Sequence, residues 1–387
     1  MTQLTGNPIR QWHRHLNILT LVVVALLGAA CGLSLSNPPP SLPETLLPAS
    51  QIAAYTANPT VQLDPTLTKV SVPSQTLAVD PSSGPLAEPS ATSTATPDPY
   101  TGLTILSLAA RSYGGGQIQE VETLAVNSYF TRTLIVYPSD GLNIYGFMNV
   151  PRREAPPYPV VIAIHGYIDP GIYTTLDYTT RYADALARAG YIVLHPNLRG
   201  YPPSDQGENL FRVGMAVDVL NLVALVKEHA GQPGPLALAA RDAIGLWGHS
   251  MGGGISTRVM IISQDVRAVV LYGAMSGDER RNFERINTYF SNGDRGREEL
   301  AYPQEAFDLI SPINFLDRVQ AVVSVHHGEE DVDVPLTWSL ETCARLEILE
   351  IPLECFTYPG QPHTFQGVGD QLFIQRTIEF YDRWLKD

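Results

Sequence analysis

Hydrophobic and polar positions change their spacing repeatedly from about residue 101 onwards, and each change predicts a new strand or helix. Residues 158–166 form a short apolar run that ends in glycine, which is typical of a strand covered on both faces. Residues 178–190 have helical spacing and a glycine where a helix would end. The alternation continues with strands at 191–200, 243–250, 266–275, 321–331 and 353–360, a helix at 210–230, and a C-terminal helix with Ile374, Ile378, Tyr381 and Leu385 on one face.

Two apolar stretches around the turn residues 138–141 predict an antiparallel hairpin over residues 133–151. Strands and helices that alternate after such a hairpin predict the α/β class, with a mostly parallel sheet flanked by helices. The chain lacks the repeats of about 40–50 residues that would build propeller blades. We therefore expect one domain over residues 101–387, with a small cap insert over about 276–312.

The N-terminal segment has the pattern of an export signal. Arg10 and Arg14 precede an uncharged stretch at 16–36. Small residues at 28–30 stand before Cys31, which resembles the lipobox of bacterial lipoproteins, where the cysteine is acylated. The match departs from that pattern at the third position before the cysteine, where glycine replaces the usual leucine. An uncleaved anchor is an alternative because the stretch is long enough to span a bilayer, and simple secretion is another. All three place the chain outside the cytoplasm.

Residues 37–100 are rich in proline, serine and threonine, and 13 of the 31 prolines lie between residues 38 and 99. Large apolar residues are too scattered there to form a core, so the segment is predicted to be a disordered tether. A flexible coil of this length averages about 45 Å end to end. The sequence thus divides into a signal peptide or anchor at 1–36, this tether, and the folded domain.

Charge and cysteine content narrow the function further. The net charge of −14 and the pI near 5.0 argue against a nucleic-acid partner. Should Cys31 carry lipid, Cys343 on a predicted helix and Cys355 in the following strand remain as an even pair. A disulfide in an oxidising compartment and two buried free thiols both fit that pair.

Gly248-His249-Ser250-Met251-Gly252 matches the Gly-x-Ser-x-Gly pattern between a predicted strand and a predicted helix. In that context the serine occupies a strained strand-to-helix turn, and side chains at the two glycines would collide with neighbouring backbone. The turn exposes the hydroxyl, and the N-terminus of the helix favours negative charge that develops there. Ser250 is the candidate nucleophile.

The partners of Ser250 follow from chain order, because an acid and then a histidine come after the serine in this arrangement. Of the nine histidines only 326, 327 and 363 follow Ser250. Asp331 stands just after a predicted strand end, and His363 is the histidine that remains downstream of it. Glu330 is the second candidate for the acid. His326 and His327 are adjacent on a strand and point to opposite faces, so no metal site is predicted, and no cofactor.

Residues 248–253, 311–319, 327–335 and His363 together resemble the α/β-hydrolase catalytic domain of the prolyl oligopeptidase family and the related dienelactone-hydrolase-like esterases. The resemblance covers about residues 150–387 and implies the α/β-hydrolase fold. The family pattern His-Gly-x-x-Asp-x-x-Val-Pro contributes the aspartate of the catalytic triad, which carries over to Asp331.

The resemblance implies acyl transfer by Ser250, His363 and Asp331. The oxyanion is expected to bind the N–H of Met251 and that of Tyr167. The family often has His-Gly-Gly where this chain has His-Gly-Tyr, so an amide or a tyrosine hydroxyl could supply the second donor.

Other polar residues near these motifs are interpreted as structural. His165 is expected to fix the oxyanion loop, His249 to pack or orient beside the nucleophile, and Arg199 to tie its loop to the sheet. Glu329, Glu330 and Asp333 are expected to form a solvated acidic turn.

We expect an extracytoplasmic, membrane-tethered serine hydrolase that acts on a small ester, amide or peptide. An esterase is favoured because no propeller is available to restrict access. A prolyl-oligopeptidase-like peptidase of dipeptidyl or oligopeptidase type is the alternative, followed by a non-catalytic surface binding protein. Charged residues in the cap insert argue against long-chain lipid substrates. The sequence does not indicate the oligomeric state.

Overall fold

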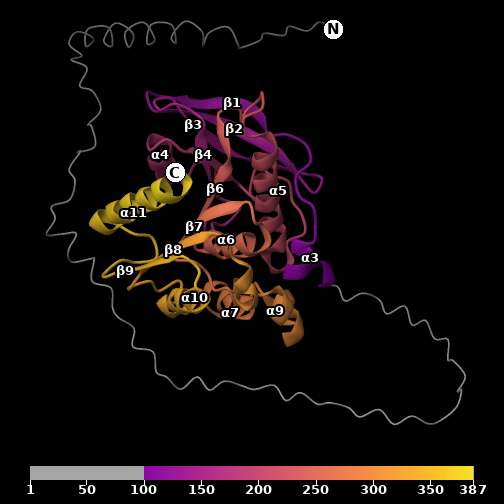
Figure 1. Ribbon diagram of the computed structural model, residues 1–387. Coiled ribbons are helices and arrows are strands. Elements are labelled where there is room, and N and C mark those ends of the chain that lie inside the picture. Colours follow the sequence, from indigo (N-terminus) through magenta and orange to yellow (C-terminus); the bar gives the residue numbers. More distant parts are fainter. Residues whose placement is uncertain (1–99, 387) are drawn as a thin grey trace, which may run out of the picture. The chain divides into compact units, whose positions relative to one another are not determined.

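A nine-stranded sheet forms the centre of the computed structural model, which describes residues 100–386 (Figure 1). The predicted export segment, Cys31 and residues 37–99 of the predicted tether lie outside the described residues. The spatial order of the strands is β1-β2-β3-β5-β4-β6-β7-β8-β9. Their bounds are β1 (Gln119–Val126), β2 (Phe130–Ser139), β3 (Leu142–Pro151), β4 (Tyr158–Ile164), β5 (Ile192–Pro196), β6 (Ala239–His249), β7 (Val266–Tyr272), β8 (Val322–Gly328) and β9 (Leu353–Tyr358).

The first strands are antiparallel and the others are parallel, as the sequence predicts. β2 and β3 pair as a hairpin, and β3 also pairs antiparallel with β5. Asp140 and Gly141 form the turn with φ of 53° and 83°, the left-handed conformation that a two-residue hairpin turn requires. From β5 to β9 every neighbouring pair is parallel. This arrangement brings the carboxyl ends of β4, β6, β7 and β8 to one edge.

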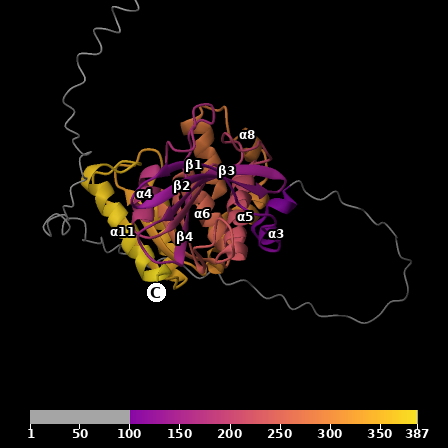
Figure 2. The same ribbon diagram turned by 90° about the horizontal axis from the view of Figure 1, so that it is seen from above.

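Helices cover both faces of the sheet. α4 and α11 contact one face, whereas α5 and α6 contact the other, and Figures 1 and 2 show this division from two directions. β4 illustrates the period of two: Val160 and Ile162 pack in the core under α5 and α6, while Val161 and Ala163 pack under α4 and α11. The helices are α3 (Ile105–Ala109), α4 (Thr180–Arg188), α5 (Val213–His229), α6 (Met251–Ile262), α7 (Glu279–Arg285), α8 (Arg297–Leu300), α9 (Gln304–Ile310), α10 (Leu336–Ile348) and α11 (Gly367–Leu385).

The insert between β7 and β8 has the predicted position and is helical. It consists of α7, a π-helical turn (Ile286–Phe290), α8 and α9, and a 3₁₀ segment (Pro312–Arg318) leads from it to β8. Further 3₁₀ turns precede α3 (Thr101–Leu103) and α5 (Leu210–Arg212). Within residues 100–386, none of the helices combines the length and hydrophobicity that crossing a bilayer requires.

Two features go beyond the sequence predictions. β1 is an edge strand that the sequence pattern did not predict, because most of its residues are exposed and two register shifts interrupt its pairing with β2. Cys343 on α10 and Cys355 on β9 form a disulfide, which decides between the two alternatives that the sequence left open.

Candidate active site

Ser250 lies between β6 and α6 at the carboxyl edge of the sheet. Its backbone has φ 56° and ψ −115°, a conformation that is strained for a residue with a side chain. The N–H of Ser250 donates to the carbonyl of Tyr272 at 3.0 Å, and its carbonyl accepts from the N–H of Met275 at 3.0 Å and that of Gly254 at 3.2 Å. These bonds hold the predicted sharp turn in place.

The two glycines of the motif are required by close backbone contacts, as expected. A Cβ on Gly248 would lie 2.3 Å from the carbonyl oxygen of Gly252, and a Cβ on Gly252 would lie 2.2 Å from that of Ile164. The second contact sets the N-terminus of α6 directly against the end of β4. The loop that follows β4 is therefore brought next to Ser250.

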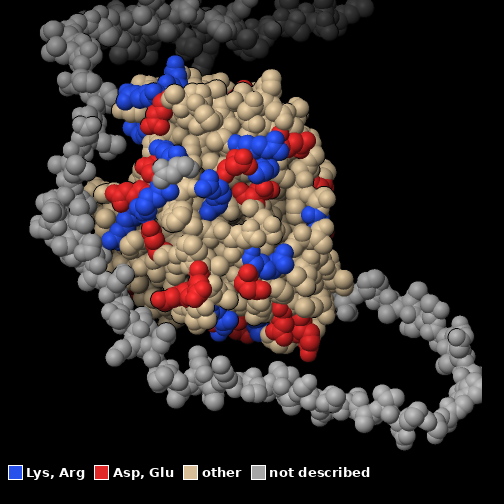
Figure 3. Space-filling model, viewed as in Figure 1, with Lys and Arg blue, Asp and Glu red and all other residues tan. Residues whose placement is uncertain are grey.

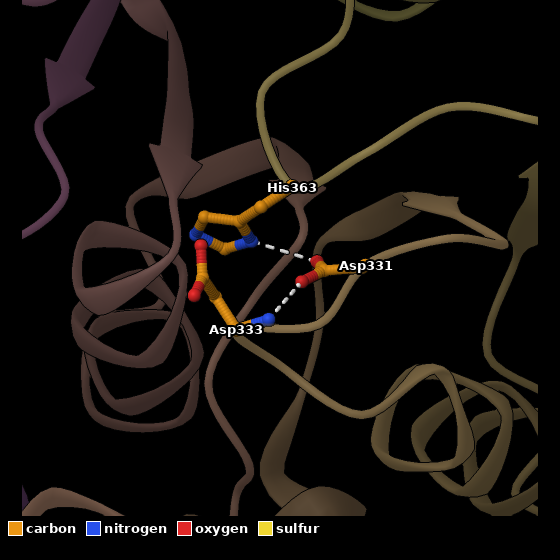
Figure 4. Close-up of side chains that lie close together, drawn as sticks. All are labelled: Asp331, Asp333 and His363. Carbon is orange, nitrogen blue, oxygen red and sulfur yellow. Dashed lines mark hydrogen bonds and ion pairs between the residues drawn. The ribbon is translucent and has the colours of Figure 1, made fainter. Parts of the chain in front are cut away.

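Asp331 and His363 come together from two loops on the same edge of the sheet. Asp331 follows β8, and His363 lies between β9 and α11. His363 Nδ1 is 2.7 Å from Asp331 Oδ2, and His327 Nε2 is 3.1 Å from the same oxygen. The N–H of Asp333 donates to Asp331 Oδ1 at 2.9 Å (Figure 4). The N–H of Val334 donates to the same oxygen at 2.8 Å.

These contacts determine the charge of Asp331. Burial alone would raise the pKa of the carboxyl, but the hydrogen bonds from His327 and His363 outweigh burial and hold the pKa below its usual range. An ionised Asp331 fixes the proton of His363 on Nδ1 and leaves Nε2 as a base. Glu330 is exposed, and its backbone N–H, not its carboxylate, bonds to the loop before His363.

Ser250 and His363 line the same cavity. Gly273, at the end of β7, has φ 48°, and a Cβ there would lie 3.2 Å from His363 Nδ1. Within the described residues, the Ser250 hydroxyl makes no hydrogen bond. Hydrogen bonds between catalytic side chains are often long in enzymes without bound substrate.

His249 supports the His363 loop from below. Its ring stacks on Tyr272 with centroids 4.1 Å apart and lies 4.6 Å from the ring of His363. Burial, together with the proximity of the His363 imidazole, lowers the pKa of His249 to about 3, so the ring is neutral. Nε2 lies 3.0 Å from the carbonyl of His363 and must donate to it, so Nδ1 accepts from the hydroxyl of Tyr178 at 2.5 Å. His249 packs and orients, as the sequence suggested.

The predicted oxyanion donors border the same space. Met251 is the first residue of α6, and a Cβ on Gly166 would lie 3.1 Å from Ser250 Cβ, so the loop with Tyr167 passes beside Ser250. The N–H of Tyr167 has no hydrogen-bond acceptor among residues 100–386. The Tyr167 side chain is 47% exposed, and the guanidinium of Arg295 lies 4.3 Å from its ring centroid.

A cavity of about 850 Å³ opens above Ser250, a volume that suits a small organic substrate. The cap insert supplies much of its wall, from Phe283 to Glu299. The lining mixes apolar and charged side chains, and it includes Tyr201, Met215, Met275, Phe283, Ile286, Phe290, Asp294, Arg295, Arg297, Glu298, Glu299 and Asp333.

Buried ion pairs join the insert to the helix that follows Ser250. Glu279, at the start of α7, contacts Arg258 of α6 and Arg212 before α5, each at 2.6 Å. Burial would raise the pKa of Glu279, but the two arginines outweigh burial and lower it. The carboxylate is therefore charged, and it fixes the cap over the cavity.

Arg199 and His165 have the structural roles that the sequence suggested. Arg199 pairs with the buried Asp218 at 2.8 Å and donates its backbone N–H to the same carboxylate. His165 is fully buried, and its ring nitrogens lie 2.6 and 2.9 Å from the carbonyl oxygens of Gly166 and Asn197. Both interactions hold loops that border the cavity.

The adjacent histidines of β8 have separate surroundings, as expected for neighbours on a strand. His326 contacts Tyr358 and Ser324, whereas His327 contacts Ser339 and Asp331. Within the described part of the chain, Asp331, Asp333 and His363 form a group whose ligating atoms lie within 4.8 Å of one another. The Asp331–His363 hydrogen bond accounts for two of these three side chains without an ion.

Two residues at the site were missed or misplaced from the sequence. Glu329 and Glu330 are exposed, as expected of a solvated acidic turn, but the prediction was wrong for Asp333, which is half-buried and lines the cavity. The turn after Asp331 folds back onto its carboxylate, and this carries Asp333 inward. Tyr178 gave no signal, because its contact with His249 joins residues far apart in the chain.

On the face that Figure 3 shows, basic and acidic side chains are interspersed.

Comparisons with known proteins agree with this geometry. Residues 177–387 match the model of the prolyl oligopeptidase family. An uncharacterised peptidase of Bacillus subtilis, YtmA, is 23% identical over 260 residues, which make up 65% of this chain and 92% of the relative.

Two solved structures share the fold. A puromycin-hydrolysing peptidase of Mycobacterium tuberculosis superposes with a TM-score of 0.55 and 18% identity, over 68% of this chain and 40% of that protein. An acetyl xylan esterase of Paenibacillus superposes with a TM-score of 0.54 and 17% identity, over 73% of this chain and 92% of the esterase. The chain thus spans less than half of the first protein and most of the second, and the shared architecture is the α/β-hydrolase fold.

Proposed function

The chain belongs to the prolyl oligopeptidase family and is a serine hydrolase, and from this premise we propose that Ser250, Asp331 and His363 form its catalytic triad. The observation that carries the proposal is the 2.7 Å contact between His363 Nδ1 and the ionised Asp331, on the cavity that Ser250 also lines. A base whose second nitrogen is free, next to a serine on a strained turn, is the arrangement that activates a hydroxyl.

The reaction then proceeds by acyl transfer. Ser250 Oγ attacks the substrate carbonyl while His363 Nε2 takes its proton, and the imidazolium is stabilised by Asp331. The N–H groups of Met251 and Tyr167 hold the oxyanion, and the N-terminus of α6 adds to the favourable field. His363 returns the proton to the leaving group, and water releases the acyl-enzyme by the same steps in reverse order.

An esterase remains the favoured activity. The cavity has room for a small organic molecule, and the insert supplies much of its wall. The fold neighbours include both an acetyl xylan esterase and a puromycin-hydrolysing peptidase, so a peptidase is the second candidate. Family membership favours this second candidate as strongly.

We also propose that the enzyme acts outside the cytoplasm, tethered to a membrane through Cys31 or an uncleaved anchor. The Cys343–Cys355 disulfide supports this location, because such bonds persist in oxidising compartments. Mass spectrometry of the mature N-terminus tests the tether: a diacylglyceryl-modified Cys31 supports the lipid, and a chain that keeps residues 16–36 supports the anchor. An unmodified N-terminus that lies beyond residue 36 contradicts both.

A matched substrate panel separates the two activities. p-Nitrophenyl esters and p-nitroanilides that share acyl groups are compared by kcat/KM in the wild type and in Ser250→Ala. Short esters are expected to exceed the matching anilides after correction for their uncatalysed hydrolysis rates. Faster turnover of anilides would assign the peptidase activity, and hydrolysis that survives in Ser250→Ala would remove the proposed nucleophile.

A further inference from the structure

The carboxylate of Asp333 lies beside the base at the floor of the cavity. Figure 4 shows it next to the imidazole of His363, on the side away from Asp331. The ligating atoms of Asp331, Asp333 and His363 are within 4.8 Å of one another, and Asp333 lines the cavity together with Ser250. A substrate bound at Ser250 therefore comes close to a second negative charge.

The backbone around Asp333 is held rigidly. Its N–H donates to Asp331 Oδ1 at 2.9 Å, and the N–H of Val334 donates to the same oxygen. Arg285 of α7 donates to the carbonyl oxygens of Asp333 and Val332 from the opposite side. The backbone that carries the carboxylate is thus fixed before substrate arrives, which reduces the entropy lost on binding.

No cation of the described residues neutralises this carboxylate. Its oxygens make no hydrogen bond or ion pair within residues 100–386. Two arginines of the cavity wall form ion pairs with other carboxylates, Arg199 with Asp218 and Arg212 with Glu279. Arg295 of the insert stacks on Tyr167. A half-buried carboxylate without a partner favours a ligand that brings a positive charge.

We propose that Asp333 determines specificity by binding a positively charged group of the substrate, an ammonium placed within a few bonds of the scissile carbonyl. The ammonium must be close to the scissile carbonyl because Asp333 lies beside His363, and His363 must itself reach the bond that is cleaved. This inference rests on the proposed hydrolase function and names the substrate class of that site. A charge-assisted contact of this kind corresponds to a preference of about tenfold or more.

Two isosteric substrate pairs test the proposal at pH 7, where an α-amino group is largely protonated. The p-nitroanilides of alanine and of 2-methylpropanoic acid place ammonium and methyl at the same position on the acyl side. Acetylcholine and 3,3-dimethylbutyl acetate form the second pair, with a trimethylammonium and a tert-butyl group at the same position on the leaving-group side. The quantity measured is the ratio of kcat/KM for the cationic and the neutral member, in the wild type, in Asp333→Asn and in Asp333→Ser.

We expect the wild type to favour the cationic member of at least one pair by about tenfold, and both variants to lower that ratio by a similar factor. Glu330→Gln removes an exposed charge from the same turn and is expected to leave the ratio unchanged. Because a ratio is independent of the fraction of folded enzyme, partial unfolding of a variant does not mimic the effect.

Three outcomes would overturn the inference: a wild type with no cationic preference in either pair, a preference that survives in both Asp333 variants, or an equal loss in Glu330→Gln. These three outcomes leave the hydrolase proposal unaffected as long as turnover disappears in Ser250→Ala. Turnover that persists in Ser250→Ala would instead remove the hydrolase site itself, whatever the ratios are.

Discussion

Replacing Gly252 by alanine tests how tightly the nucleophile turn is packed. The new Cβ would lie 2.2 Å from the carbonyl oxygen of Ile164 and 2.7 Å from that of His165, both backbone atoms at the end of β4. Ordinary van der Waals contact begins at 3.4 Å. The start of α6 must therefore move by about 1 Å relative to the loop that carries the second oxyanion donor.

Such a movement has two measurable consequences. Overpacking of this kind lowers the free energy of unfolding by about 1–3 kcal/mol. Misplacement of a nucleophile by about 1 Å costs about 100-fold in rate. We expect Gly252→Ala to lose about 100-fold in kcat/KM for a short p-nitrophenyl ester, with the loss mainly in kcat, and to unfold at lower urea concentration than the wild type.

Gly254→Ala is the matched control on the same helix. A Cβ there would have one close neighbour, the Cβ of Met275 at 3.2 Å, and relieving this contact requires a shift of only a few tenths of an ångström. Alanine also favours the helix by about 1 kcal/mol over glycine. Activity is expected to stay within about threefold of the wild type. If Gly252→Ala and Gly254→Ala behave alike in both assays, the reasoning from the backbone contact at Gly252 is refuted.

Three further predictions concern ionisable side chains. Glu279→Gln leaves Arg258 and Arg212 without a counter-charge, so urea denaturation should show that the free energy of unfolding falls by about 3–5 kcal/mol. The control Glu284→Gln, at an exposed position of α7, should change it by less than about 0.5 kcal/mol, and equal effects of the two variants would contradict the structure. Because His249 is neutral in the fold, with its pKa lowered to about 3, the unfolded chain binds an extra proton below about pH 6.5. This group alone should lower the free energy of unfolding by about 2 kcal/mol between pH 7 and pH 5. In His249→Gln the decrease should be smaller by that amount, and an identical pH dependence in the two proteins would refute the prediction. Asp331→Asn should lower kcat by about 10⁴-fold without unfolding the protein, measured by ester turnover and thermal denaturation, and a loss of less than about tenfold would exclude the acid role.

Local patterns were sufficient for most of the fold. The continuous apolar run of β4 reflects a strand that is buried on both faces, and the helical spacing of α4 and α11 reflects helices that are buried on one face. The need for glycine at 248 and 252 was predictable from the Gly-x-Ser-x-Gly motif, and a Cβ at either position would collide with backbone. β1 was not predictable, since an exposed edge strand with bulges has no alternation of buried and exposed positions.

The candidate triad could be chosen by chain order, because few histidines follow Ser250. The surroundings of the triad could not, since they depend on contacts between distant segments. Tyr178 reaches His249 across 71 positions, and Asp333 turns inward because its own backbone bonds to Asp331. The Cys343–Cys355 bridge likewise depends on the packing of α10 against β9, which spacing alone leaves open.

Mass spectrometry after treatment with a fluorophosphonate shows whether Ser250 is an activated nucleophile, because the reagent marks a serine that a neighbouring base activates. We expect one adduct on the wild type, mapped to Ser250, no adduct on Ser250→Ala, and much slower labelling of His363→Ala. An adduct on Ser250→Ala at the wild-type rate, or a wild type that stays unlabelled, would contradict this expectation.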